Sequence, residues 1–261
     1  MTEISSAEPK IARYLITGGT SGIGLATAAR LSRLPDARVV INGRDVARGE
    51  AASLKLRELA PHARIAFVAA DVSNKDSVAN LIAHAHDELD GPIDVLVNSA
   101  GGDFVPTLFH ETSLQSIDAA VSQWLLATMY CCRLALPYMS DGGAIVNVAS
   151  DAAKVPTPGE TVVGAVMAGI AMFSRTLAME AKRRHIRVNA VTPSLVRDTR
   201  TFARITAGGF SAKLFEKATR AAHLGLPEPD EVAAIIAFLA SPDAARITGQ
   251  VISVNGGISA G

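Results

Sequence analysis

Seven short apolar runs, rich in valine and isoleucine, recur along the chain and alternate with longer stretches of helical pattern. The runs cover residues 13–17, 38–42, 64–69, 94–98, 144–149, 186–191 and 250–254. The helical stretches cover residues 22–34, 45–60, 75–90, 113–139, 160–184 and 229–241. Apolar runs without polar alternation are typical of strands buried on both faces. The alternation therefore predicts an α/β fold, a doubly wound parallel sheet of about seven strands with right-handed crossovers and helices on both faces.

The length of the chain and its composition fit one domain. A chain of 261 residues with 49% hydrophobic and 19% charged residues is typical of a globular protein, so we expect a single domain over residues 1–261. Within it, residues 1–12 are expected to form an N-terminal lead-in. Residues 194–226 have no strong periodicity, and we expect a mobile, lid-like segment over a cleft there.

Charge and cysteine content narrow the classes of partner. The chain has 25 basic and 25 acidic residues, a net charge of +0, which gives no field to attract nucleic acid or anionic lipid. Cys131 and Cys132 are neighbours on a predicted helix and point in different directions, so we expect buried free thiols and neither a disulfide nor a metal site. We expect a soluble cytoplasmic protein, because the N-terminus lacks the apolar core of a signal peptide and no apolar run reaches transmembrane length.

A strand, a glycine-rich turn and a helix follow one another in the segment LITGGTSGIGLATAARL, residues 15–31. Thr17, Gly18, Gly22 and Gly24 fit the pattern TGxxxGxG. Such glycines permit a tight turn and the close approach of a pyrophosphate, and the helix N-terminus supplies free N–H groups. The segment predicts a cradle for a dinucleotide, while a turn that only packs the helix on the strand is the alternative.

The second predicted strand ends in the segment INGRD, residues 41–45. Folds that bind NAD place an acidic residue at the tip of this strand, where it bonds the ribose hydroxyls. Here Gly43 is followed by Arg44, a side chain that suits the 2′-phosphate of NADP. An exposed loop cation with no ligand is the equally weighted alternative.

These motifs and several others resemble the short-chain dehydrogenase/reductase family over almost the whole chain. The resemblance rests on TGGTSGIG (17–24), ADV (70–72), NSAG (98–101, where Ser99 departs from the family's NNAG), IVNVAS (145–150), IRVNAV (186–191) and ITGQVISVNGG (247–257). It implies a Rossmann-like fold and NAD or NADP as the cofactor. It also implies a set of cofactor-binding residues: Gly18, Ser21, Gly22, Ile23, Gly24, Arg44, Asp71, Val72, Asn98 and Ala100.

The residues that carry the family's chemistry are mostly absent. The family uses an asparagine, a serine and a Tyr-x-x-x-Lys pair, in which the tyrosine transfers the proton and the lysine lowers its pKa and holds the nicotinamide ribose. Carried over by position, Ser150 remains as a remnant, whereas Val163, Met167 and Trp124 occupy the tyrosine, lysine and asparagine positions. We therefore expect no catalytic residues in this chain.

The loop after the sixth strand departs from the family as well. The family's glycine and threonine, the second of which helps to hold the nicotinamide and pyrophosphate, correspond to Ser194 and Asp198. A carboxylate facing a pyrophosphate repels it, although a one-residue shift would bring Thr199 there instead. Together with the lost lysine, this predicts that NAD or NADP binds weakly or not at all.

The segment SDAAKV, residues 150–155, resembles dehydrogenases that act on 3-hydroxyacyl-CoA thioesters in anaerobic aromatic degradation. One enzyme of that group, in toluene degradation, combines a subunit that has the catalytic residues with a companion that lacks them. The resemblance implies a catalytically degenerate subunit that assembles with an active paralogue as a hetero-oligomer, a heterotetramer. The long helices over 113–139 and 160–184 are the expected contact surfaces.

Two other functions fit the same residues. A stand-alone NADPH-dependent reductase with altered chemistry, of the quinone type, would receive its protons from solvent and bind NADPH at Arg44. A ligand-binding pseudoenzyme would use the apolar pocket that Val163, Met167 and Trp124 predict, with an aromatic ligand as its occupant.

Overall fold

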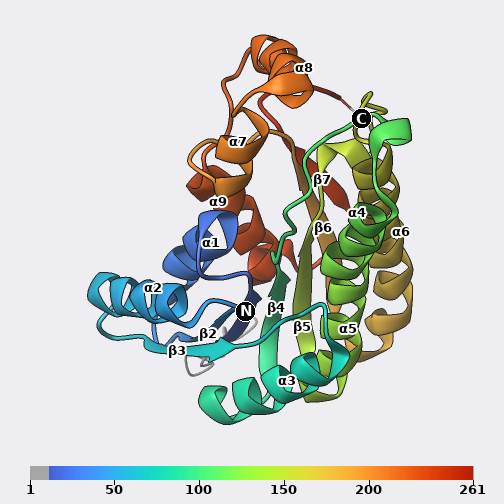
Figure 1. Cartoon of the computed structure of the whole chain (residues 1–261). Helices are drawn as coiled ribbons and strands as arrows, with labels where there is room; N and C mark the ends of the chain where they lie inside the picture. The colour runs from blue at the N-terminus through green and yellow to red at the C-terminus, as the bar shows by residue number, and fades with distance from the viewer. Residues whose placement is uncertain (1–11, 261) are drawn as a thin grey trace.

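The computed structural model describes residues 12–260 and has a seven-stranded parallel sheet as its central layer (Figure 1). The strands are β1 (Arg13–Thr17), β2 (Arg38–Gly43), β3 (Arg64–Ala69), β4 (Ile93–Asn98), β5 (Met139–Val148), β6 (Arg187–Pro193) and β7 (Val251–Val254). Their spatial order is β3-β2-β1-β4-β5-β6-β7, and every neighbouring pair is parallel. The predicted doubly wound sheet is confirmed. The N-terminal lead-in lies outside the described residues except for Ala12.

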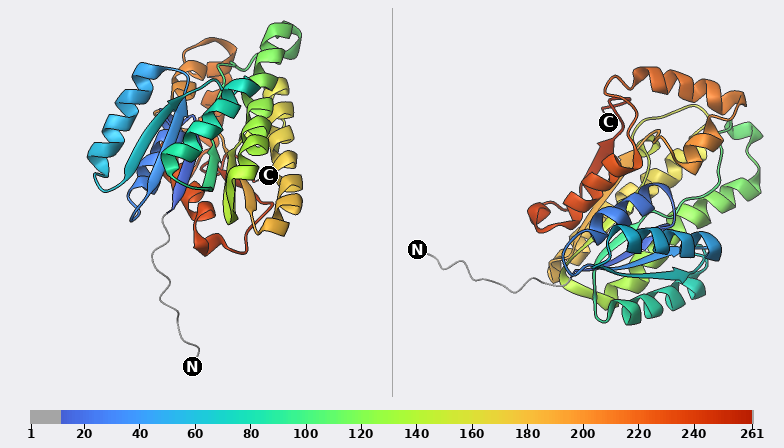
Figure 2. Two further views of the ribbon diagram at one scale, coloured as in Figure 1. Left: turned by 90° about the horizontal axis from the view of Figure 1, so that it is seen from below. Right: turned by 90° about the vertical axis from the view of Figure 1, so that its left-hand side faces the viewer.

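Helices cover both faces of this sheet, as Figure 2 shows from two further directions. The helices are α1 (Gly22–Ser32), α2 (Val46–Leu59), α3 (Lys75–Leu89), α4 (Leu114–Ala120), α5 (Ala127–Ala135), α6 (Thr161–Ala181), α7 (Arg200–Ile205), α8 (Gly209–Ala221) and α9 (Pro229–Ala240). One core lies between the sheet and α1, α2 and α9, and the other lies between the sheet and α3, α5 and α6.

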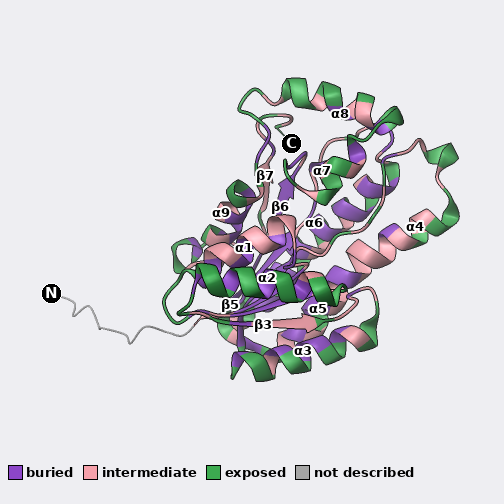
Figure 3. Ribbon diagram, turned by 60° about the vertical axis from the view of Figure 1, so that its left-hand side comes forward, coloured by how far each residue is buried: buried purple, intermediate pink, exposed green. Residues whose placement is uncertain are grey.

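Both cores are filled from the same strands, because successive strand side chains point to opposite faces. Leu15 of β1 is buried with α3, α5 and α6, whereas its neighbour Ile16 is buried with α1 and α9. Leu96 and Val97 of β4 divide in the same way. Figure 3 shows the result, with mostly buried strands at the centre and the exposed residues on the outer sides of the helices and in the loops. This explains why the apolar runs of the sequence do not alternate.

Two predicted segments differ in the structure. The helix expected over 113–139 runs from Leu114 to Tyr138, but its segment Val121–Leu126, between α4 and α5, is π-helical, and β5 begins at Met139. The lid-like segment over 194–226 contains two helices, α7 and α8, which pack on each other through their own small apolar cluster around Ile205 and Phe215. α8 buries Ser211 and Phe215, four residues apart, on one side, so this segment contains a helical pattern that the prediction missed.

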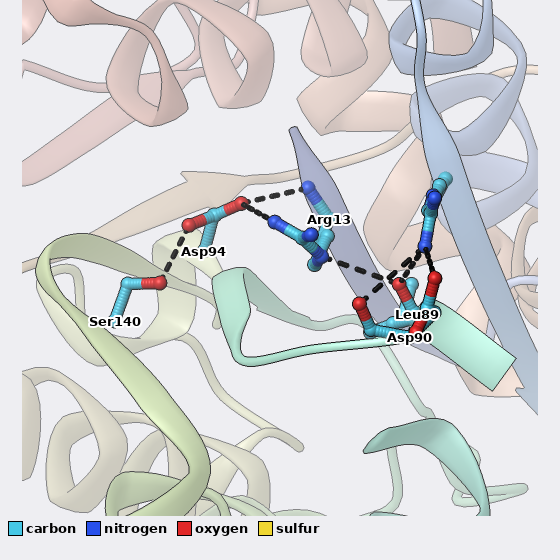
Figure 4. Close-up of polar contacts among 6 residues, drawn as sticks. Arg13, Leu89, Asp90, Asp94 and Ser140 are labelled. Carbon is cyan, nitrogen blue, oxygen red and sulfur yellow. Dashed lines mark hydrogen bonds and ion pairs between the residues drawn. The ribbon is translucent and has the colours of Figure 1, made fainter. Parts of the chain in front are cut away.

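A polar network fixes the amino ends of the strands (Figure 4). The main-chain N–H of Arg13 donates to one carboxylate oxygen of Asp94 at 3.0 Å, and the hydroxyl of Ser140 donates to the other at 2.6 Å. The guanidinium groups of Arg13 and Arg38 both donate to the carbonyl oxygen of Leu89, at 3.2 and 2.9 Å. These bonds join β1, β2, β4 and β5 at one edge, and the carboxyl ends of the strands form the opposite edge.

The two cysteines are free and buried, as predicted. Burial raises the pKa of the Cys132 thiol to about 12, and that of Cys131 rises for the same reason, so neither ionises near neutral pH. Within residues 12–260, no group of three or more histidine, cysteine, aspartate or glutamate side chains is placed to hold a metal ion.

Two helical stretches are long and apolar enough to cross a membrane by length and composition alone, so the expectation that no apolar run reaches that length is wrong. They are Leu114–Tyr138 and Thr161–Arg184. In their most apolar windows, 33% of the first stretch and 50% of the second are buried inside this domain. Their hydrophobicity is therefore used at least in part to cover the sheet.

Candidate active site

A cavity of about 400 Å³ lies at the carboxyl ends of the strands. Loops that follow β1, β2, β4, β5 and β6 line it, and α7 and α8 contribute the side away from the sheet. The order of the sheet reverses between β1 and β4, and ligands of open α/β sheets bind at this switch point. The cavity therefore occupies the position where this architecture places a bound molecule.

The glycine loop has the geometry of a phosphate cradle. Gly18 and Gly22 have φ angles of 65° and 52°, a region that favours glycine. A Cβ atom on Gly24 would lie 2.3 Å from the carbonyl oxygen of Gly18, so the helix could not approach the strand with any larger residue. The N-cap Ser21 makes no side-chain cap bond, which leaves the first N–H groups of α1 available to an anion.

Most of the residues predicted to bind the cofactor line this cavity. They are Gly18, Ser21, Gly22, Ile23, Arg44, Asp71, Val72 and Ala100. Gly24 and Asn98 do not line it. Gly24 packs behind the loop, and Asn98 is buried in a network with Cys132 and Asn147, so both act on the cavity through the backbone that they position.

The tip of β2 carries positive charge. Arg44 and Arg48 both line the cavity, and Arg48 pairs with Asp45 at 2.7 Å. Arg44 is half-exposed, with one guanidinium nitrogen 3.9 Å from a carboxylate oxygen of Asp103. NAD-binding folds have a carboxylate at the tip of this strand, whereas this chain has two guanidinium groups. These groups favour a ligand with a phosphate near the tip of β2.

The three residues that the sequence analysis assigned to the family's asparagine, tyrosine and lysine positions meet in the structure. Val163 and Met167 are 8% and 6% exposed and form one apolar cluster with Trp124 and Phe104. The ring centroids of Phe104 and Trp124 are 6.3 Å apart. None of these side chains carries a titratable proton. The wall of the cavity at the positions assigned to the family's proton relay is therefore apolar.

Trp124 belongs to the π-helical turn between α4 and α5, and its indole contacts the loop that follows β4. A Cβ atom on Gly102 would lie 3.2 Å from the Trp124 ring, so loop and ring are in close contact. The remnant Ser150 also lines the cavity, and its hydroxyl accepts a hydrogen bond from the N–H of Ala152 at 3.3 Å.

Glu160 is a cavity residue that the sequence analysis missed. It holds the N-cap position of α6 without a side-chain capping bond, three positions before Val163, so it lies about one turn from Val163 on the same side of the helix. Burial raises the pKa of its carboxyl group to about 7, the negative charge of Asp151 adds to the rise, and a hydrogen bond from Thr157 opposes it. The helical spacing from Val163 is the signal that could have identified it.

The loop after β6 corrects the expectation for Asp198. Asp198 is exposed, adopts a φ angle of 54° and does not line the cavity. Thr199 is the residue beside the glycine loop, since a Cβ atom on Gly22 would lie 3.4 Å from its methyl group. Thr199 also caps α7, where its hydroxyl accepts from the N–H of Phe202 at 3.0 Å. The predicted repulsion between a carboxylate and a pyrophosphate therefore has no basis here.

A pair of ionic contacts joins the segments at the mouth of the cavity. Arg204 of α7 reaches a carboxylate oxygen of Asp103 at 2.5 Å and the carbonyl oxygen of Gly102 at 3.3 Å. Since Asp103 also lies near Arg44, one carboxylate joins the loop after β2 to α7. A dinucleotide phosphate that engages Arg44 would compete with this contact.

The fold and the cavity together define a Rossmann-like protein with a dinucleotide-type cradle. The family model described as enoyl-(acyl carrier protein) reductase matches residues 18–259. The chain belongs to the short-chain dehydrogenase/reductase family.

Similar proteins of this family are dehydrogenases and reductases. The chain is 38% identical to cis-4-hydroxycyclohexanecarboxylate dehydrogenase of Sinomonas cyclohexanicum, covering 94% of this chain and 96% of the relative. It is 34% identical to 2,3-dihydroxy-2,3-dihydro-p-cumate dehydrogenase of Pseudomonas putida, covering 93% and 92%. Among solved structures, an NADPH-bound short-chain oxidoreductase from Pseudomonas aeruginosa PAO1 with an atypical catalytic centre is 30% identical, with a TM-score of 0.86 over 96% of this chain and 97% of that one.

Proposed function

We propose that this chain is a catalytically degenerate subunit that assembles with an active paralogue of the same family in the cytoplasm. The observation that carries the proposal is the apolar cluster of Trp124, Val163 and Met167 in place of the proton relay. A positioned acid or base contributes typically 10²–10⁴-fold to a rate, and these three side chains supply none. The fold is retained, so its packing surfaces remain available to a partner.

The active paralogue is the subunit that performs the reaction. We assign to it the oxidation of a 3-hydroxyacyl-CoA thioester with NAD, as the SDAAKV segment suggests. The specific substrate class we favour is 2-[hydroxy(phenyl)methyl]succinyl-CoA of anaerobic toluene degradation. In this chain NAD or NADP binds weakly, because Met167 cannot hold the nicotinamide ribose as a lysine does.

An exposed apolar face of α6 is the surface we assign to the partner. Met172 and Met179 are 58% and 59% exposed although they belong to a helix whose other side is in the core. The small residues Ala165 and Ala168 are exposed along the same helix. Small and flexible side chains of this kind allow a second helix to pack closely.

Replacing Met172 by arginine is expected to reduce hetero-oligomer formation at least tenfold, because a charge would be buried against the partner helix. The chain would be co-expressed with a short-chain dehydrogenase encoded beside it that keeps Tyr-x-x-x-Lys, and native mass spectrometry would measure the assembled fraction. Leu54→Arg on α2 is the matched control, since Leu54 is also 58% exposed and lies away from this face.

Either of two results would remove the assignment of this surface. One is a hetero-oligomer that forms as well with Met172→Arg as with Leu54→Arg. The other is a chain that stays monomeric or pairs only with itself when the paralogue is present. Loss of assembly in both variants would point to a general effect of surface charge and would equally count against the α6 face.

A stand-alone NADPH-dependent reductase is the second candidate. Two observations favour it: Arg44 and Thr199 line an open cradle, and the structurally similar oxidoreductase from Pseudomonas aeruginosa holds NADPH although its catalytic centre is atypical. The two candidates differ in whether the purified chain alone consumes NADPH.

A further inference from the structure

The inner part of the cavity combines an apolar wall with two acids, the half-buried Glu160 and the buried Asp151. Trp124, Val163 and Met167 supply the wall, and Phe104 packs against the indole. Glu160 lines the same cavity from the start of α6, and Ser150 lines it from the end of β5. A ligand that fits this space needs an apolar body and a polar atom that a carboxyl group and a hydroxyl group can both reach.

The surroundings of Glu160 favour its neutral form. The residue before it, Gly159, lies between the loop over residues 104–108 and α8: the N–H of Thr107 bonds the carbonyl oxygen of Gly159 at 2.9 Å, and a Cβ atom on Gly159 would meet the Phe210 ring. Both neighbours are mainly apolar there. The charged group that acts on Glu160 is Asp151, which is itself negative.

No positive group is aimed at this carboxyl among the contacts of the described residues. The carboxylate of Asp151 is bonded by Asn255 and Ser259, and Lys154 bonds the Val251 carbonyl and the Ser253 hydroxyl. The other charged residues that line the cavity are Arg44, Arg48, Asp71, Asp103, Arg200 and Arg204. Arg44 and Arg204 contact Asp103, and Arg48 contacts Asp45, so these three cations are engaged elsewhere, while Arg200 is exposed at the first position of α7.

We propose that Glu160, as a neutral carboxylic acid, donates a hydrogen bond to the carbonyl oxygen of an apolar aromatic ketone bound in this cavity, and that the Ser150 hydroxyl contributes a second bond to the same oxygen. A neutral acid in an apolar site is a strong donor because no water competes for its proton. An amine ligand fits less well, since it would require the ionised carboxylate that burial and Asp151 disfavour. A carboxylate ligand would be repelled by Asp151.

This binding site goes beyond the proposed function. A subunit without turnover can bind the ketone, and so can a reductase. The experiment therefore uses the isolated chain and measures binding only, so that its failure leaves the assembly result untouched and failure to assemble leaves this result untouched.

Acetophenone is the probe, and calorimetric titration of the full chain measures its affinity from about pH 5 to about pH 9. Binding that requires the protonated acid is complete below the pKa and is lost as pH rises through it. We expect a constant affinity below about pH 6 and a fall of about tenfold for each pH unit above about pH 7. Ethylbenzene, which lacks the carbonyl oxygen, is expected to show no pH dependence. Trp124 is the one tryptophan of the chain, so its emission gives a second readout.

Variants of Glu160 distinguish the hydrogen bond that its side chain donates from the space that the side chain fills. Glu160→Gln keeps a donor that does not titrate, so its affinity should stay within about threefold of the wild type at pH 6 and lose the pH dependence. Glu160→Leu should lose about tenfold at pH 6 and also lose the pH dependence. Glu180→Gln, at an exposed position near the end of α6, is the matched control and should behave as the wild type.

The proposal is overturned by acetophenone binding that is absent, that does not change with pH, or that strengthens as pH rises. It is also overturned if Glu160→Gln retains the pH dependence of the wild type, because the titrating group would then be another residue.

Discussion

Replacing Asn147 by leucine is expected to lower the free energy of unfolding by about 3 kcal/mol, because it breaks a fully buried polar network. Asn147 of β5 is 0% exposed. Its side chain accepts a hydrogen bond from Asn98 of β4 at 2.9 Å and donates one to the Ser174 hydroxyl of α6 at 2.9 Å. Leucine fills a similar volume but leaves the Asn98 amide with only the weaker acceptor sulfur of Cys132, at 3.3 Å.

Urea denaturation followed by circular dichroism measures this loss. Asn80→Leu on the exposed side of α3 is the matched control and should stay within about 0.5 kcal/mol of the wild type. A loss below about 1 kcal/mol for Asn147→Leu would mean that the network does not hold β4, β5 and α6 together. The network bears on the cavity, because Asn98 is the last residue of β4 and the loop that contacts Trp124 begins directly after it.

A triple variant that restores the family's three groups is expected to gain turnover. Trp124→Asn, Val163→Tyr and Met167→Lys together should oxidise NADPH with acetophenone about 10²–10⁴-fold faster than the wild-type chain. The physical reason is that Val163, Met167 and Trp124 already meet around one cavity. The new tyrosine, lysine and asparagine would therefore lie close enough together to act as proton donor, ribose ligand and proton relay. The cradle supports the cofactor because Thr199, and not Asp198, lies beside Gly22.

The control replaces only the proton donor. The same triple variant with Val163→Phe instead of Val163→Tyr has nearly the same shape and no hydroxyl, so it should return to the wild-type rate. Calorimetric titration with NADPH and thermal unfolding establish that both variants bind nucleotide and fold. A folded, NADPH-binding triple variant without activity would show that this chain lost more than its proton relay.

The sheet and its layers could be predicted from the sequence, because a strand that is buried on both faces is a continuous run of apolar residues. Val39, Val40 and Ile41 are apolar without interruption since they fill both cores in turn. The glycine loop could also be predicted, because Gly24 approaches Gly18 too closely for any other residue to fit. The apolar residues Val163 and Met167 were assigned to the tyrosine and lysine positions by the family resemblance, which carries the motif over from Ser150 onto this sequence.

Other features depended on contacts between distant segments. The π-helical turn around Trp124 has no local signature, since the residues on either side of it form ordinary helix. The choice between Asp198 and Thr199 rests on a single left-handed residue, which shifts the loop by one position. The raised pKa of Glu160 results from burial and from the charge of Asp151. The burial depends on a loop that is distant in the sequence, so the residues around Glu160 do not predict it.

The central claim is that this chain has lost proton transfer at its cavity, and NADPH consumption by the purified chain alone tests it most directly. With acetophenone present from about pH 5 to about pH 9, the account predicts a rate no higher than that of the heat-denatured protein, while the restored triple variant, assayed beside it, is active. Steady NADPH oxidation that declines as pH rises through about 7 and disappears in Glu160→Gln would contradict the claim, because Glu160 would then be acting as the catalytic acid of a stand-alone reductase.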